Sequence, residues 1–187
     1  MNIAERAKRI CLSPDTEWPV ISSEHATLGT LITGYVLPLA SLSAIGAFVA
    51  AAMVNMGLAA WFGVLVTSLV MSVIGVVALS FIIDALAPTF GAPKSSASAA
   101  KVAAYSPTAA WVAGVAQFVP LVGGVIAFVG ALYSIYLLYL GLMRVMKSRQ
   151  DRAVGYTVVV IVVTIVVGFA ATFIVTAIGL APAIRVV

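Results

Sequence analysis

The sequence contains little charge and almost no histidine or cysteine. Of its 187 residues only 9% are charged, one is a histidine and one a cysteine, whereas 63% are hydrophobic. The mean hydropathy is +1.19. A typical soluble domain is about half apolar and about a quarter charged, so a chain this poor in charge cannot cover a surface that faces water. The composition excludes an ordinary soluble protein and predicts an all-α integral membrane protein.

The scarcity of reactive residues excludes several kinds of site. The single histidine, His25, and the single cysteine, Cys11, cannot supply the set of ligands that zinc prefers, and one cysteine forms no internal disulfide. The sequence shows no serine or cysteine nucleophile pattern, no paired aspartates and no HExxH helix. We therefore predict no catalytic residue, no metal and no cofactor, and a protein that is not an enzyme.

Long uncharged runs predict five membrane-spanning helices. About 20 apolar residues cross the ~30 Å hydrocarbon core of a bilayer. No charge occurs between His25 and Asp84, and this run is too long for one crossing, so we expect Asn55 and Gly57 to divide it. The uncharged run 102–143 is likewise divided, at Pro120. The predicted spans are 30–53, 60–85, 106–119, 123–144 and 153–180. The third is so short that it requires a tilt, an earlier start or a locally thinner bilayer.

The first 27 residues are expected to form an interfacial segment, followed by a compact five-helix bundle over 28–187. Residues 1–12 show the helical spacing of a short basic amphipathic helix. Ser13 and Pro14 then predict a second helix start, with serine as the N-cap and proline at the first helical position. Trp18 follows, where its ring suits the boundary between lipid and water.

Loop charge predicts the orientation in the membrane, because lysine and arginine are retained on the cytoplasmic side. With five spans, nine basic residues fall on one side and Arg185 alone on the other. We expect a cytoplasmic N-terminus, a C-terminus on the opposite side and a working surface on the cytoplasmic face. Its candidate residues for binding partners or lipid are Arg6, Lys8, Arg9, Trp18, Glu24, His25, Arg144, Lys147, Arg149 and Arg152. The expected partners are the lipid bilayer, anionic headgroups, and a membrane protein or a second copy of the chain; no basic stripe on a soluble fold indicates nucleic acid.

Polar residues within the spans allow a second interpretation, a small permease or channel with a polar cavity between the helices. Its candidates are Asp84, Gln117, Tyr133, Tyr136 and Tyr139, the tyrosines lying on one helical stripe. Each also has a structural interpretation: an ion pair for Asp84 with a nearby arginine or lysine, an interhelical hydrogen bond for Gln117 and helix packing for the tyrosines.

Four stretches give the chain a resemblance to a known family: LSPDTEWPVI, YSPTAAWVAGV, YSIYLLYLGLMRVMKS and DRAVGYTVVVIVV. Together they are similar to the bacterial branch of the Yip1 domain family, most specifically from Tyr133 to Val160. The resemblance implies five transmembrane helices, a cytoplasmic N-terminus and a bacterial inner membrane. Eukaryotic relatives act in membrane trafficking and bind Rab-type GTPases; here a short N-terminal segment replaces their longer hydrophilic one. We expect a non-enzymatic protein that organises membrane or partner proteins.

Overall fold

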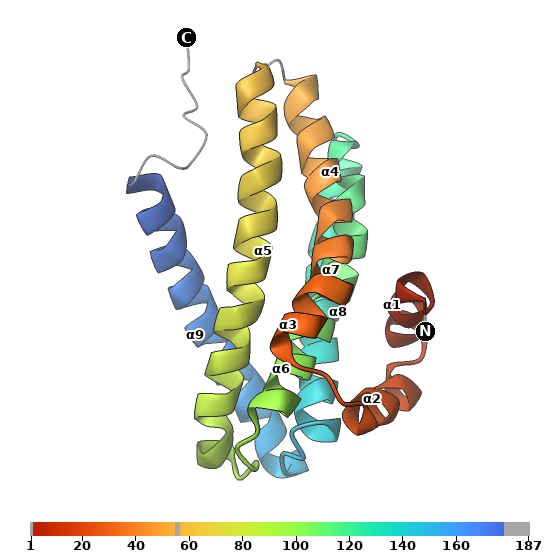
Figure 1. Ribbon diagram of the computed structural model, residues 1–187, viewed down its shortest axis with the longest axis vertical. Coiled ribbons are helices and arrows are strands. Elements are labelled where there is room, and N and C mark those ends of the chain that lie inside the picture. The colour runs from red at the N-terminus through yellow and green to blue at the C-terminus, as the bar shows by residue number, and fades with distance from the viewer. Residues whose placement is uncertain (1, 55–56, 178–187) are drawn as a thin grey trace.

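Four long apolar helices dominate the structure. The computed structural model describes residues 2–54 and 57–177, and all regular elements within these ranges are helical. Figure 1 shows the long helices running alongside one another. The stretches long and apolar enough to cross a membrane are Leu28–Met53, Leu58–Phe90, Val122–Arg144 and Gln150–Ile174. The prediction of an all-helical, multi-pass membrane protein is confirmed.

These stretches match four of the five predicted spans. The first consists of α3 (Leu28–Leu31), a π-helical segment η1 (Ile32–Val36) and α4 (Leu37–Met53); the second consists of α5 (Leu58–Leu86) and η2 (Ala87–Phe90); the others are α8 (Val122–Arg144) and α9 (Gln150–Ala177). Thr27 begins the first span, because its hydroxyl accepts the N–H of Thr30 while the Thr30 hydroxyl accepts the N–H of Thr27. The predicted break at Asn55 and the predicted end at Leu180 lie outside the described residues.

The third predicted span is a broken helix that begins earlier than residue 106. It consists of α6 (Ser96–Tyr105), α7 (Thr108–Gly114) and the 3₁₀ segment η3 (Val115–Phe118). Pro107 separates α6 from α7, because proline has no backbone N–H to continue the helical hydrogen bonds and its ring collides with the carbonyl four residues earlier. The Ser106–Pro107 pair therefore divides this segment into two helices, and the segment is not among the four uninterrupted spans.

Close helix contacts hold α4, α7 and α8 together. A Cβ atom at Gly46 of α4 would lie 2.5 Å from the carbonyl oxygen of Gly114. A Cβ atom at Gly130 of α8 would collide with the Cβ of Ala113 in α7. Small residues at such points allow backbones to approach closely without large side chains between them.

The last helix, α9, leaves the bundle along its length. Near its start the Tyr156 hydroxyl donates to the carbonyl oxygen of Ile83 on α5, and the Tyr156 ring stacks on Phe90 at 4.9 Å between centroids. Further along, Val166 and Phe173 are exposed, and Figure 1 shows α9 diverging from α5. In a membrane this apolar surface is covered by lipid.

The N-terminal segment forms two short helices against the side of the bundle, α1 (Ile3–Leu12) and α2 (Pro14–Ser23). The amphipathic helix and the helix start at Ser13 and Pro14 are where the sequence predicted them, although the Ser13 side chain makes no capping hydrogen bond. Residues Arg6, Ala7 and Ile10 of α1 face inward and are buried. We call residues 3–24 the N-terminal hairpin.

Candidate functional site

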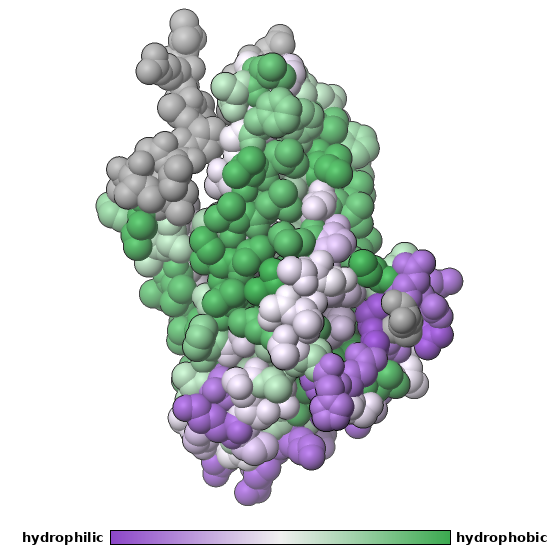
Figure 2. Space-filling model, viewed as in Figure 1, coloured by the Kyte–Doolittle hydropathy of each residue, from purple (hydrophilic) through white to green (hydrophobic). Residues whose placement is uncertain are grey.

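Strongly hydrophilic residues gather at one end of the bundle and on the N-terminal hairpin, while hydrophobic residues cover most of the remaining face that Figure 2 shows. We define the charged end as the N-terminal hairpin, the α5–α6 turn (residues 87–95) and the α8–α9 turn with the helix ends beside it (residues 144–152). All the ion pairs among the described residues involve these segments or the adjoining helix ends. The charged end is therefore the candidate site.

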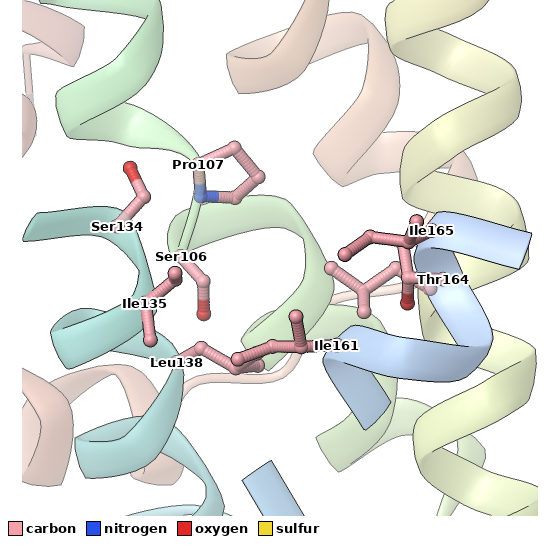
Figure 3. A pocket seen from close by; sticks show the side chains of 9 residues that line it. Ser106, Pro107, Ser134, Ile135, Leu138, Ile161, Thr164 and Ile165 are labelled. Carbon is pink, nitrogen blue, oxygen red and sulfur yellow. The ribbon is translucent and has the colours of Figure 1, made fainter. Parts of the chain in front are cut away.

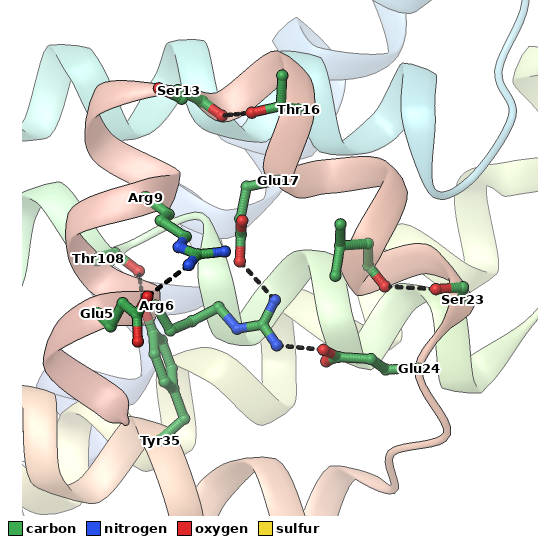
Figure 4. Close-up of polar contacts among 11 residues, drawn as sticks. Glu5, Arg6, Arg9, Ser13, Thr16, Glu17, Ser23, Glu24, Tyr35 and Thr108 are labelled. Atoms are coloured by element: carbon green, nitrogen blue, oxygen red, sulfur yellow. Dashed lines mark hydrogen bonds and ion pairs between the residues drawn. The ribbon is translucent and has the colours of Figure 1, made fainter. Parts of the chain in front are cut away.

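A buried ionic cluster centred on Arg6 fixes the N-terminal hairpin. The Arg6 guanidinium donates from Nη1 to Glu17 at 2.6 Å and from Nη2 to Glu24 (Figure 4). The Arg6 and Glu17 side chains are only 9% and 4% exposed. The guanidinium carbon also lies 5.7 Å from the centre of the Tyr105 ring, close enough for a cation–π contact. One cation thus joins both helices of the hairpin to α6.

The environment of Arg6 keeps it charged. Burial alone lowers the pKa of this guanidinium, but the hydrogen bond to Glu24 and the neighbouring Glu24, Tyr105 and Glu17 groups raise the pKa above its ordinary value. Because its donors are directed at carboxylates inside the protein, Arg6 is not on the surface where the sequence placed it. Glu24 likewise faces Arg6 and is partly exposed.

The Trp18 ring is fully buried, which corrects its predicted place at the lipid–water boundary. It meets the Tyr105 ring edge to face at 6.5 Å between centroids. It also packs on the backbone of α8, where Gly141 has no side chain to obstruct it. The indole Nε1 has no hydrogen-bond partner among the described residues. The tryptophan therefore anchors the hairpin instead of marking the interface.

Two further contacts bind the hairpin to the bundle. Lys101 of α6 donates from Nζ to the carbonyl oxygen of Ser22 at 2.8 Å. Tyr133 of α8 donates from its hydroxyl to the carbonyl oxygen of Cys11 at 2.7 Å. Both carbonyl oxygens lie in the last turn of their helix, where a helix leaves such groups without an internal partner. The hairpin is thus bound to the bundle at the C-terminal ends of α1 and α2 as well as at Arg6.

The other predicted interface residues lie on the surface of the charged end. Arg144 pairs with Asp15 at 3.1 Å, Arg149 pairs with Asp151 at 3.2 Å, and Arg9 pairs with Glu5. Exposed pairs of this kind contribute only about 0–1 kcal/mol each. In residues 2–54 and 57–177, the exposed cations with no ion-pair or hydrogen-bond partner are Lys8, Lys94, Lys147 and Arg152. His25 is also exposed.

The residues predicted for a polar cavity have separate neighbours. Asp84 accepts the backbone N–H of Ser95 at 2.8 Å instead of pairing with an arginine or lysine, and Gln117 donates to the Ser43 hydroxyl at 3.2 Å. The tyrosines divide as well: Tyr133 binds Cys11, Tyr136 is 43% exposed, and Tyr139 is partly buried against the core. Only the Tyr133 and Tyr136 rings meet, at 5.6 Å between centroids.

A small apolar cleft of about 170 Å³ lies where the broken helix faces α8 and α9 (Figure 3). Ser106 and Thr164 on its walls direct their hydroxyls to carbonyls of their own helices. Ser134 of α8 accepts the N–H of Ala110 at 3.0 Å, across the break at Pro107. These hydroxyls therefore form hydrogen bonds with the backbone of the helices that line the cleft. No group of three histidine, cysteine, aspartate or glutamate residues suited to a metal occurs in the described part of the chain.

Sequence comparison identifies the family. The model of the Yip1 domain matches residues 8–182. The chain belongs to the Yip1 domain family. No curated protein and no solved structure matches it. The matched region of this Yip1-type membrane protein includes Glu17 and Glu24, whereas their partner Arg6 lies just before it.

Three of the four stretches that carry the Yip1 resemblance meet at Trp18. LSPDTEWPVI provides Trp18 itself, YSPTAAWVAGV provides Tyr105, and YSIYLLYLGLMRVMKS provides Gly141, and the indole contacts both of these residues. The sequence alone does not assign Glu17 as the partner of Arg6 or Gly141 as the contact of Trp18. A glycine within an apolar span is a signal of close packing, whereas an acid in the first turn of a short helix is ordinary.

Proposed function

We propose that this Yip1-type protein is a non-enzymatic organiser of the membrane, which crosses a bacterial inner membrane five times and binds anionic lipid or membrane-protein partners at its charged end. The observation that carries the proposal is the concentration of exposed cations there. Four exposed cations form no ion pair with an acidic residue within the described residues, so their charge is free to attract an anion: Lys8, Lys94, Lys147 and Arg152.

The broken helix supplies the missing crossing in this proposal. Residues 96–118 at about 1.5 Å per residue extend to roughly 35 Å, enough for the ~30 Å hydrocarbon core. With that crossing, the charged end lies in the cytoplasm by the positive-inside rule and the C-terminus lies on the opposite side. The predicted place of the C-terminus, including Arg185, lies outside the described residues.

The N-terminal hairpin supports an organising role over transport. Its outer side offers Lys8, Arg9 and Glu5 to the surroundings, while its inner side is fixed by Arg6 and Trp18. A rigid, charged element beside the spans suits binding of headgroups or of another protein. The permease alternative has less support, because Asp84, Gln117 and Tyr133 each serve a separate helix contact.

Two measurements test the proposal. Reporter fusions at the two ends of the chain should report opposite compartments, with the N-terminus inside; a shared compartment overturns the topology. A photocrosslinking amino acid at Lys147 or Arg152 should then give specific crosslinks in native membranes, while one at the exposed Leu58, at the far end of α5, should not. Flux of ions or small solutes in liposomes, abolished by Asp84→Asn, would instead favour the permease.

A further inference from the structure

Two apolar grooves adjoin where the N-terminal hairpin rests on the spans. The first lies between α1, α4 and α7, has a volume of about 610 Å³ and includes Pro38 and Leu42 in its walls. The second lies between α7 and α8, has a volume of about 560 Å³ and includes Val129. Both volumes fall within the roughly 300–1,000 Å³ of ligand pockets. Cys11 and Val112 line both grooves, so the grooves share a wall.

The second groove runs along a membrane-spanning helix. Its α8 wall extends from Tyr133 to Val125, eight residues or about 12 Å of helix. This direction leads away from Arg144, the residue that ends α8 at the charged end. Val125 and Val129 are exposed. The groove therefore starts at the hairpin and leads into the apolar part of the bundle, where its natural occupant is hydrocarbon.

One free cation lies at the first groove. Lys8 lines it and is exposed, and the described residues provide no ion-pair partner for its ammonium group. The other two cations of α1 are neutralised, Arg6 by Glu17 and Glu24 and Arg9 by Glu5. A single positive charge beside two adjoining apolar grooves complements a molecule with one anionic group and two apolar chains.

We propose that these grooves bind one anionic diacyl phospholipid, with its phosphate at Lys8 and its two acyl chains on either side of Val112. The site rests on the proposed function, because it requires the charged end to meet an anionic leaflet. The lipid site goes beyond the proposed function, because it gives one lipid a fixed position. The other exposed cations of the charged end do not line these grooves and would attract headgroups only by their charge. The hairpin thereby becomes one wall of a lipid site.

The test measures retention of phosphatidylglycerol by the purified protein in detergent, by native mass spectrometry. One molecule per chain should remain bound, and Lys8→Gln or Val112→Trp should lower its affinity at least fivefold. The matched controls Lys147→Gln, an exposed cation elsewhere on the charged end, and Val66→Trp, a similarly exposed valine on α5, should retain it. Equal retention of phosphatidylcholine, or equal loss in Lys147→Gln, overturns the site in favour of diffuse attraction.

A second readout uses the wild-type chain and so does not depend on the folding of a variant. Cys11 lies between the grooves, so phosphatidylglycerol should slow its alkylation by a maleimide severalfold, while phosphatidylcholine and single-chain lysophosphatidylglycerol should not. No protection, or protection that accompanies dimer formation instead of lipid retention, overturns the proposal. Because these measurements are made in detergent, they can succeed even if the reporter fusions refute the proposed topology, and the two failures are distinguishable.

Discussion

Trp18 of α2 packs directly on the backbone of α8 at Gly141. A Cβ atom at position 141 would lie 3.0 Å from both Cη2 and Cζ2 of the indole and 3.0 Å from Cγ1 of Val102. Such distances are tighter than ordinary van der Waals contact, and the fully buried ring has little room to withdraw. The missing side chain at one position of a membrane-spanning helix therefore allows the N-terminal hairpin to dock.

Replacing this glycine should loosen the hairpin. Gly141→Ala places a methyl group against Trp18, and overpacking of this kind costs about 1–3 kcal/mol. The cost opposes the ~1 kcal/mol by which alanine is preferred to glycine within a helix. We expect a lower midpoint of thermal unfolding in detergent, together with faster proteolysis of the N-terminal hairpin.

Gly124→Ala is the matched control, because it lies in the same helix and has no atom within 4 Å of its added Cβ. It should leave the unfolding midpoint unchanged or raise it, since only the helix preference acts there. Equal destabilisation by the two variants would show that α8 tolerates no added methyl group and that the Trp18 contact has no special role.

Arg6→Met should undock the hairpin through its charges. Methionine preserves much of the side-chain volume but leaves Glu17 buried without its cation, and breaking a buried ion pair on one side costs about 3–5 kcal/mol. Arg9→Met removes an exposed pair with Glu5 and should cost less than about 1 kcal/mol. Thermal unfolding and limited proteolysis separate the two; similar behaviour would contradict the role assigned to Arg6.

Cys11 reports hairpin docking through its thiol. Burial raises the pKa of this thiol above its ordinary value, so less of the reactive thiolate is present near neutral pH. Maleimide should therefore alkylate the folded protein more slowly than a free cysteine peptide, and the rate should rise over a higher pH range. Because the folded-state pKa is raised, the stability linked to this group is fully present below the unfolded pKa and is lost as pH rises through the folded pKa.

Undocking of the hairpin should expose Cys11 and bring the pKa of its thiol back towards the ordinary value. In Arg6→Met the pH profile of Cys11 alkylation should move down towards that of the peptide, whereas in Arg9→Met it should stay where it is in the wild type. The chain has no other cysteine, so the alkylation of Cys11 can be followed without replacing any further residue. An unchanged profile in Arg6→Met would show that α1 remains docked without its ionic cluster.

The sequence predicted what depends on local composition and missed what depends on distant partners. Uncharged runs located four spans, because a long apolar helix needs only lipid around it. Arg6 appeared as a surface cation because its partners lie 11 and 18 residues away across a turn. Trp18 appeared interfacial because nothing in its neighbourhood reveals Gly141.

The Ser–Pro pairs show how the same local signal has two outcomes. At Ser13 the backbone leaves helical geometry, with φ −143° and ψ 58°, and Pro14 occupies the first position of a new helix. At Ser106 the backbone stays helical, with φ −60° and ψ −38°, and Pro107 only interrupts the hydrogen bonding between α6 and α7. Residues 87–101 have the proline, glycine, serine and lysine content of a loop, but from Ser96 onwards the chain is helical and packs against α5.

The hydrogen bond across the break at Pro107 should contribute to stability. In an unbroken helix the N–H of Ala110 would bond to the carbonyl of Ser106, but here it donates to the Ser134 hydroxyl of α8 at 3.0 Å. Ser134→Ala removes the acceptor and leaves a backbone donor unpaired in an apolar region, which costs about 1–3 kcal/mol. Ser72→Ala is the control, because that hydroxyl bonds only to the Ser68 carbonyl of its own helix. We expect a clear fall in thermal stability for the first variant and little change for the second; equal effects would mean that the bond across the break does not support the broken helix.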